Sequence, residues 1–164
     1  MHYTETNLTS NTVQLARASL PSQSETYYYG LKEKPIQDLF SFQKNHTPIF
    51  LFPDENATFI TYDEMKKIVG PIELIIPDGT WSKAKKIKRR THFFKTLKSF
   101  TLIPGPPSTY RLRTQKQAHH LSTFEAMARA IKEIEGEKSY ASLMNNFDLM
   151  VEATLKSRRG GVFS

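Results

Sequence analysis

Short, continuously apolar segments alternate along this chain with segments whose apolar residues recur at helical spacing. The sequence predicts buried strands at 47–52 (TPIFLF), 72–76 (IELII) and 99–103 (SFTLI). It also predicts a strand at 26–29 and an extended segment at 110–113. Strands that alternate with helices indicate an α/β fold, a single domain with a mostly parallel sheet flanked by helices.

The helical segments are set by apolar spacing and by their end signals. A residue that can cap a helix precedes the segment ending at Arg90 (Asp78 or Thr80) and the segment ending at Ile134 (Ser122 or Thr123). The other helices are predicted over 13–19, 35–45, 62–69 and 140–155, with Gly70 and Gly136 as stop signals.

Three loops that each contain proline lie at the carboxyl ends of the predicted strands. They are Phe52-Pro53-Asp54, Pro77-Asp78-Gly79 and Pro104-Gly105-Pro106. Ligands of open parallel sheets bind where the carboxyl ends of the strands meet the following loops. We therefore expect the functional site at these three loops.

The positive charge of the chain is concentrated in one segment. The 46 residues between Asp78 and Glu125 contain no acidic side chain and 11 of the 23 lysines and arginines, and the chain has a net charge of +7. A concentrated positive field indicates a polyanionic partner, most simply a nucleic acid. A membrane surface is the weaker alternative, because a proline-rich loop interrupts the basic segment.

The remaining composition excludes several classes of protein. The chain has no cysteine, no apolar run of about 18 residues and no pattern of a secretory signal, so we expect a cytoplasmic protein without disulfides. It also lacks a phosphate-binding loop, a G-x-G-x-x-G motif and a nucleophile elbow. The adjacent His119 and His120 point to different faces, and we expect no metal site there.

Asp78-Gly79-Thr80-Trp81 places a carboxylate between a buried strand and the amino end of a helix, where anions also bind. The alternative is an ordinary strand-to-helix turn with a capping residue and a core tryptophan.

The following helix carries six cations without an acid three or four residues away, which favours contact with a nucleic-acid backbone over a solvated face. In the 104–113 loop, Tyr110 is expected to stack on a base, and Arg111 or Arg113 to bind phosphate, unless the loop is simply basic.

Taken together, five segments in order resemble the DTW-domain family: LFPDEN (51–56), LIIPDGTW (74–81), SKAKKI (82–87), PPSTYRLR (106–113) and LSTFEAMARAI (121–131). Asp78, Thr80 and Trp81 reproduce the D-x-T-W pattern that names the family. His2, Glu5 and Ser10-Asn11-Thr12 are similar to its early H-x-x-E and N-T segments.

The resemblance implies a tRNA-uridine aminocarboxypropyltransferase, which moves the 3-amino-3-carboxypropyl group of S-adenosylmethionine to N3 of a uridine in tRNA. It implies a fold similar to SPOUT methyltransferases, with a C-terminal trefoil knot around the co-substrate. A methyltransferase on the same scaffold and a non-catalytic RNA-binding module are the alternatives. Many members also carry an N-terminal cysteine cluster and a first strand, which this chain is expected to lack, so one domain over 1–164 without zinc is predicted.

The implied roles fall on three sets of residues. The catalytic set is Asp78, as base or orienting group, with Thr80 and Trp81. S-adenosylmethionine is expected to contact Leu51, Phe52, Pro53, Ile76, Pro77, Ile103, Ser108, Tyr110, Ser122, Thr123 and Glu125. The tRNA is expected to contact Lys83, Lys85, Lys86, Lys88, Arg89, Arg90, Arg111 and Arg113.

Overall fold

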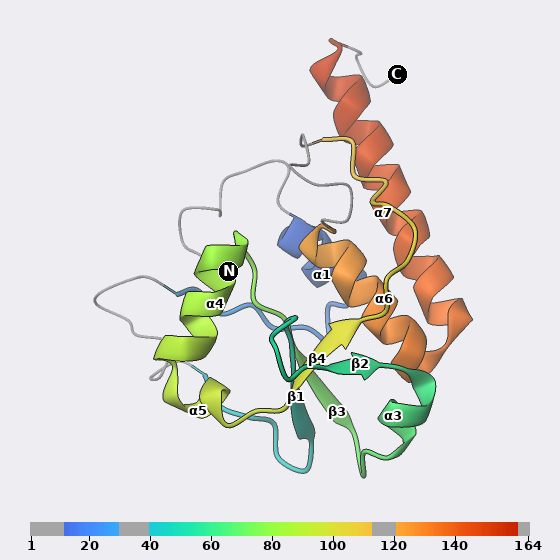
Figure 1. The fold of residues 1–164 in the computed structure, drawn as a ribbon. Helices are drawn as coiled ribbons and strands as arrows, with labels where there is room; N and C mark the ends of the chain where they lie inside the picture. The colour runs from blue at the N-terminus through green and yellow to red at the C-terminus, as the bar shows by residue number, and fades with distance from the viewer. Residues whose placement is uncertain (1–11, 30–39, 113–120, 161–164) are drawn as a thin grey trace. The chain divides into compact units, whose positions relative to one another are not determined.

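A computed structural model describes residues 12–29, 40–112 and 121–160 of the chain. These residues fold into two compact units (Figure 1). The sheet unit is described over residues 25–29 and 40–103, and the helical unit over 12–24, 104–112 and 121–160. No helix within these ranges combines the length and the apolar content that crossing a bilayer requires.

The sheet unit contains a four-stranded sheet in which every pairing is parallel. Its strands are β1 (Thr47–Leu51), β2 (Thr58–Ile60), β3 (Ile72–Ile75) and β4 (Ser99–Leu102), in the order β2-β4-β1-β3. The helices of this unit are α3 (Tyr62–Lys66), α4 (Trp81–Arg90) and α5 (His92–Lys95). The predicted α/β class with a mostly parallel sheet is therefore confirmed.

Aromatic side chains fill the space between β1 and the helices that follow β3. Phe50 and Phe52, at the end of β1, pack with Ala84 and Ile87 of α4 and with Phe94 of α5. Phe40 lies against this cluster, with its ring stacked on Phe93 at a centroid distance of 5.2 Å. The apolar residues of α4 thus bury one face of the helix, and its lysines and arginines lie on the remaining faces.

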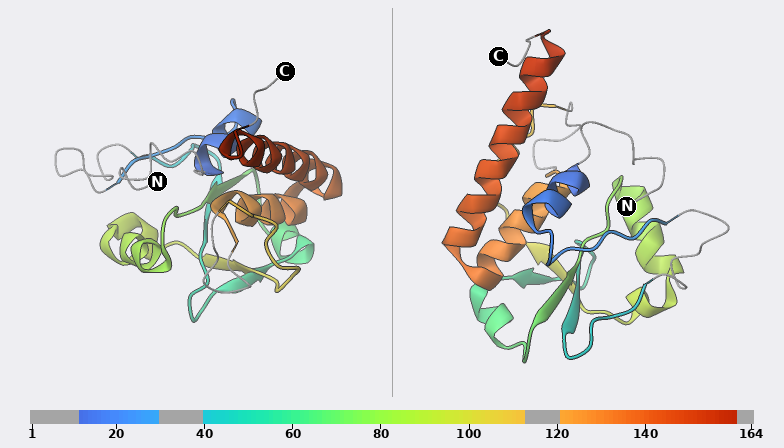
Figure 2. Two further views of the ribbon diagram at one scale, coloured as in Figure 1. Left: turned by 90° about the horizontal axis from the view of Figure 1, so that it is seen from above. Right: turned by 180° about the vertical axis from the view of Figure 1, so that it is seen from behind.

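The helical unit consists of α1 (Thr12–Ser19), α6 (Thr123–Glu135) and α7 (Glu137–Arg158), which lie side by side in every view (Figures 1 and 2). Phe124 of α6 stacks on Phe147 of α7 at 5.6 Å, and both side chains are fully buried. Gly136 separates the two helices with a φ of +98°, a conformation that favours glycine, so α6 ends where the sequence predicts.

Several local predictions are wrong. Residues 26–29 are irregular apart from one bridging residue at Tyr29, and 40–45, the described part of the helix predicted over 35–45, contains only a turn. Phe40 packs against the aromatic cluster from this irregular segment. Arg111 and Leu112 form a turn and not the predicted extended segment.

Two short elements were not predicted at all. The strand β2 has only three residues, and α5 has only four. Such lengths give too few positions for a period of 2 or 3.6 to be recognised. Pairing with β4 stabilises β2, and burial of Phe94 in the aromatic cluster stabilises α5.

Candidate functional site

Two of the predicted loops meet at one edge of the sheet. In the parallel register, Phe50 of β1 lies opposite Ile75 of β3, so these adjacent strands end at the same level. The loops that begin at Phe52 and at Ile76 therefore emerge side by side. Ser99, the first residue of β4, also lies opposite Phe50, so β4 begins at this level and Ile103 lies further along the sheet.

The turn from β3 into α4 carries the D-x-T-W residues. Thr80 is the N-cap of α4, and its hydroxyl accepts a hydrogen bond from the Lys83 amide at 3.4 Å. Asp78 is half-buried, and its carbonyl accepts a hydrogen bond from the Tyr29 hydroxyl at 3.2 Å. Thr80, and not Asp78, is therefore the N-cap of α4. The Trp81 side chain lies outside the described structure, so its predicted stacking stays a prediction.

Gly79 gives this turn its shape. Its φ is +122°, in the region that side chains other than glycine rarely adopt, and a Cβ here would lie 3.3 Å from the Tyr29 hydroxyl. Tyr29 therefore supports the turn from a segment that lies far away in the chain. The sequence analysis missed Tyr29, because nothing in the run Tyr27-Tyr28-Tyr29 points to a residue so far along the chain.

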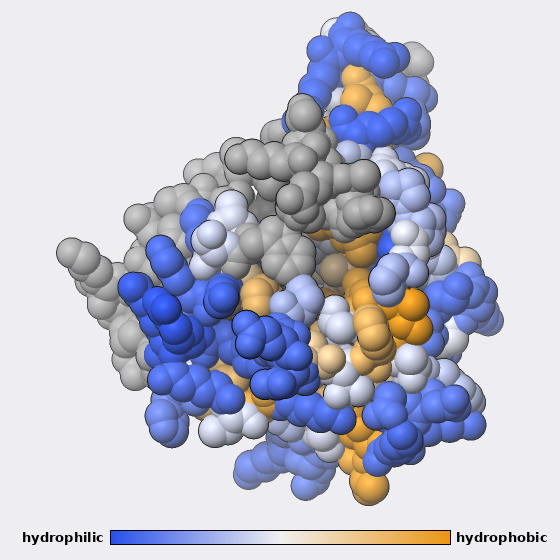
Figure 3. Space-filling model, in the orientation of Figure 1, coloured by the Kyte–Doolittle hydropathy of each residue, from blue (hydrophilic) through white to orange (hydrophobic). Residues whose placement is uncertain are grey.

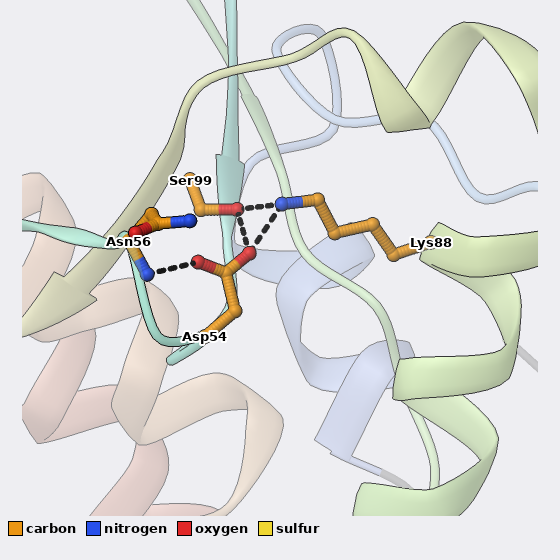
Figure 4. Close-up of polar contacts among 4 residues, drawn as sticks. All are labelled: Asp54, Asn56, Lys88 and Ser99. Atoms are coloured by element: carbon orange, nitrogen blue, oxygen red, sulfur yellow. Dashed lines mark hydrogen bonds and ion pairs between the residues drawn. The ribbon is translucent and has the colours of Figure 1, made fainter.

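A compact polar cluster lies beside the loop after β1 (Figure 4). The Asp54 carboxylate accepts hydrogen bonds from the Ser99 hydroxyl at 2.6 Å and from the Asn56 amide at 3.1 Å. The Lys88 ammonium contacts Oδ2 of Asp54, the oxygen that accepts from Ser99, and it also contacts the Ser99 hydroxyl. Burial by itself would raise the pKa of Asp54, but these hydrogen bonds and the charge of Lys88 outweigh burial, so that the pKa lies below its usual value.

The cations of α4 do not share one environment. Lys85, Lys86, Arg89 and Arg90 are exposed, whereas Lys83 and Lys88 are half-buried. Hydrophilic side chains gather over α4 and α5 in the space-filling view (Figure 3). The exposed cations lie at spacings of one and four residues, so they form a continuous positive strip along the helix.

In the helical unit, Glu125 joins the proline-rich loop to the start of α6. Glu125 is 2% exposed, and its carboxylate accepts hydrogen bonds from the Ser108 hydroxyl at 2.7 Å and the Thr109 backbone amide at 3.0 Å. It also accepts from the amide and the hydroxyl of Ser122, each at 2.8 Å, which completes a capping box. Thr123 is the first residue of α6. This cluster unites three of the residues predicted to contact S-adenosylmethionine, and their hydrogen bonds join them to one another.

Two further predicted residues have partners within the helical unit. Tyr110 is 6% exposed and its ring centroid lies 5.5 Å from that of Phe147, so the ring offers little surface for stacking on a base. Arg111 forms a surface ion pair with Glu152 of α7. Arg113 lies outside the described residues.

Metal-binding side chains do not converge in the described ranges, where no group of three histidines, cysteines, aspartates or glutamates is suitably placed. His119 and His120 lie outside these ranges. The predicted lack of a metal therefore stays a prediction.

The fold and its edge residues define an α/β protein whose D-x-T-W turn follows the strand next to β1 in a parallel sheet. A model of the DTW domain matches residues 1–155, and the chain belongs to the DTW-domain family. Two proteins named tRNA-uridine aminocarboxypropyltransferase 2, from Mus musculus and Macaca fascicularis, are each 30% identical to this chain over 136 residues. That alignment covers 82% of this chain and 46% of each relative.

A third protein of the same name, from Drosophila melanogaster, is 30% identical over 104 residues, or 58% of this chain and 41% of its own. The chain thus spans about half the length of the curated relatives that it matches. No solved structure gives a significant match.

Proposed function

We propose that this protein transfers the 3-amino-3-carboxypropyl group of S-adenosylmethionine to N3 of a uridine in tRNA. The observation that carries the proposal is the D-x-T-W turn of a DTW-domain chain, set at the carboxyl edge of a parallel sheet. Relatives that cover most of this chain carry the name of that activity. In the reaction, uridine N3 loses its proton and bonds to the γ-carbon as the carbon–sulfur bond breaks, and the sulfur keeps the electron pair in 5′-methylthioadenosine.

The residues of the turn suit the reacting uridine. The Asp78 carboxylate is the group proposed to accept the N3 proton or to orient the edge of the base. Gly79 has no side chain and is exposed, so the backbone is open to close approach by a substrate. The amino end of α4 favours an anion beside the turn, which fits the carboxylate of the co-substrate.

The co-substrate is proposed to lie along the edge formed by Leu51, Phe52, Pro53, Ile76 and Pro77. Backbone groups are available to ligands where parallel strands give way to loops. The co-substrate contacts predicted for Ile103, Ser108, Tyr110, Ser122, Thr123 and Glu125 stay predictions. The trefoil knot and the cytoplasmic location that the sequence analysis expects also stay predictions.

The tRNA backbone is proposed to contact the exposed strip of α4. Lys85, Lys86, Arg89 and Arg90 carry no acidic neighbour at three or four residues, so their charges are available to phosphates. Lys83, Arg111 and Arg113 are proposed as additional contacts, and Arg111 would have to leave Glu152 to make one.

The direct test uses two preparations of S-adenosylmethionine, one labelled in the methyl group and one in the carboxyl group. Incubation with tRNA is expected to leave label in the RNA from the carboxyl position only. Methyl label in the RNA would assign the protein to the methyltransferases. Tight tRNA binding with no label from either preparation would favour a non-catalytic RNA-binding module.

Asp78→Asn tests the residue proposed to handle the proton. Transfer is expected to fall at least about 100-fold, the lower end of a typical general-base contribution. Asp148→Asn, an exposed aspartate of α7, is the matched control and should retain wild-type transfer. Equal transfer by the two variants would refute the role of Asp78 without refuting the reaction.

A further inference from the structure

Lys88 differs from its neighbours on α4 in where its charge lies. The Lys88 side chain is 17% exposed and the Asp54 side chain 28%, whereas Lys85, Lys86, Arg89 and Arg90 all lie at the surface. An ammonium that contacts a carboxylate and a hydroxyl has few donors left for a phosphate. Sequence pattern alone groups Lys88 with the RNA-contacting cations, but its surroundings do not.

The cluster around Lys88 joins three separate elements at the level where β1 ends. Asp54 belongs to the loop after β1, Lys88 to α4, and Ser99 begins β4 opposite Phe50. The Lys88 ammonium also lies 5.8 Å from the centre of the Phe50 ring. The loop is thereby fastened to the helix that begins at the D-x-T-W turn.

A catalytic serine is the other chemistry that such a cluster suggests. Ser99 is 5% exposed, and its hydroxyl hydrogen is directed to the Asp54 carboxylate. The Lys88 ammonium donates to the Ser99 oxygen, so it does not act as the base that a nucleophile needs. The geometry favours a structural tie over a nucleophile.

We infer that Lys88 is a positioning residue, which holds the loop at 52–56 in the conformation that the co-substrate requires and does not contact RNA. This inference rests on the proposed function for the identity of the co-substrate. Fixing that loop matters because a loop that must be ordered when the ligand binds lowers the affinity for that ligand. The inference separates Lys88 from the other five cations of α4.

The first test needs no catalysis. Hydrogen–deuterium exchange of the peptide covering residues 53–60 is compared in wild type, Lys88→Met and the control Lys86→Met. Lys88→Met should speed exchange of the loop about tenfold, because the Asn56 amide depends on a fixed Asp54. Lys86→Met should leave this exchange unchanged, and unchanged exchange in Lys88→Met would overturn the inference.

The second test separates positioning from RNA contact. Lys88→Met is expected to raise the KM for S-adenosylmethionine about fivefold to tenfold, with kcat within about twofold of wild type. The slope of log tRNA affinity against log salt concentration should equal that of wild type in Lys88→Met. In Lys86→Met this slope should fall by the contribution of about one phosphate contact. A lowered slope in Lys88→Met would make Lys88 an RNA contact and overturn the inference.

The double variant Asp54→Asn, Lys88→Met distinguishes this tie from general loss of stability. Since each single change breaks the same contact, the two effects on KM should be far from additive. Additive effects would overturn the inference. Failure of the wild-type protein to transfer either label would count against the proposed function, and it would leave the exchange experiment to decide the role of Lys88.

Discussion

Glu125→Gln tests how much of the helical unit depends on one buried carboxylate. The Thr109 amide donates to one carboxylate oxygen, and the Ser122 amide and two hydroxyls donate to the other. Glutamine has nearly the same shape but only one oxygen. The hydroxyls of Ser108 and Ser122 can rotate to suit the new group, but the two backbone amides cannot both find an acceptor.

The expected loss of stability follows from that count. One hydrogen bond to a charged group contributes about 1.5–3 kcal/mol, and a buried amide left without an acceptor costs about 1–3 kcal/mol. These two effects overlap, so we expect Glu125→Gln to lower the free energy of unfolding by about 3 kcal/mol. Ser122→Ala, which removes only the capping hydroxyl, should cost about 1 kcal/mol.

Urea unfolding followed by circular dichroism measures both variants. With a slope near 2 kcal/mol per molar urea, the midpoint for Glu125→Gln should fall by about 1.5 M. Glu135→Gln, an exposed residue at the end of the same helix, is the control and should shift the unfolding free energy by less than about 0.5 kcal/mol. A Glu125→Gln midpoint within the range of that control would refute the reasoning.

Three further predictions concern the sheet unit. Gly79→Ala should lower the stability of the folded state by about 1–2 kcal/mol in a thermal melt and should lower transfer. The reason is that the φ of +122° disfavours alanine and the new Cβ would crowd Tyr29. An unchanged melting temperature would contradict this strain. Thr80→Ala should lower the free energy of unfolding by about 0.5 kcal/mol, the low end for a lost N-cap, since the hydrogen bond from the Lys83 amide to the Thr80 hydroxyl is long at 3.4 Å. A loss above about 2 kcal/mol would show that Thr80 has another role. The lowered pKa of Asp54 means that its ion pair stabilises the folded state above the ordinary aspartate pKa of about 4, and that this stabilisation is lost as pH falls through the lowered value. The free energies of unfolding of wild type and Asp54→Asn, measured between about pH 7 and 3, should therefore converge at the acid end. A difference that stays constant with pH would contradict the stabilising role of the Asp54 ion pair.

Much of the local structure follows from the sequence because its causes are local. The apolar runs at 47–52, 72–76 and 99–103 match β1, β3 and β4, and Gly136 ends α6 as predicted. The capping box of Ser122 and Glu125 is readable as S-x-x-E before an apolar helix. The D-x-T-W pattern is likewise local, and it lies within the match to the DTW domain over residues 1–155.

The partners of the site residues are a different matter, since they come from distant parts of the chain. Lys88 meets Asp54 across 34 residues, Ser108 meets Glu125 across 17, and Tyr29 meets the Asp78 carbonyl across 49. No periodicity encodes such separations, because they depend on the strand order β2-β4-β1-β3 and on packing within each unit. The sequence alone determined the strands β1, β3 and β4, the helices α4 and α6 and the D-x-T-W turn, through apolar spacing and capping. Only the tertiary structure decided that Lys88 is tied to the loop after β1 while its neighbours remain exposed, because burial and pairing of a charge depend on what folds against it.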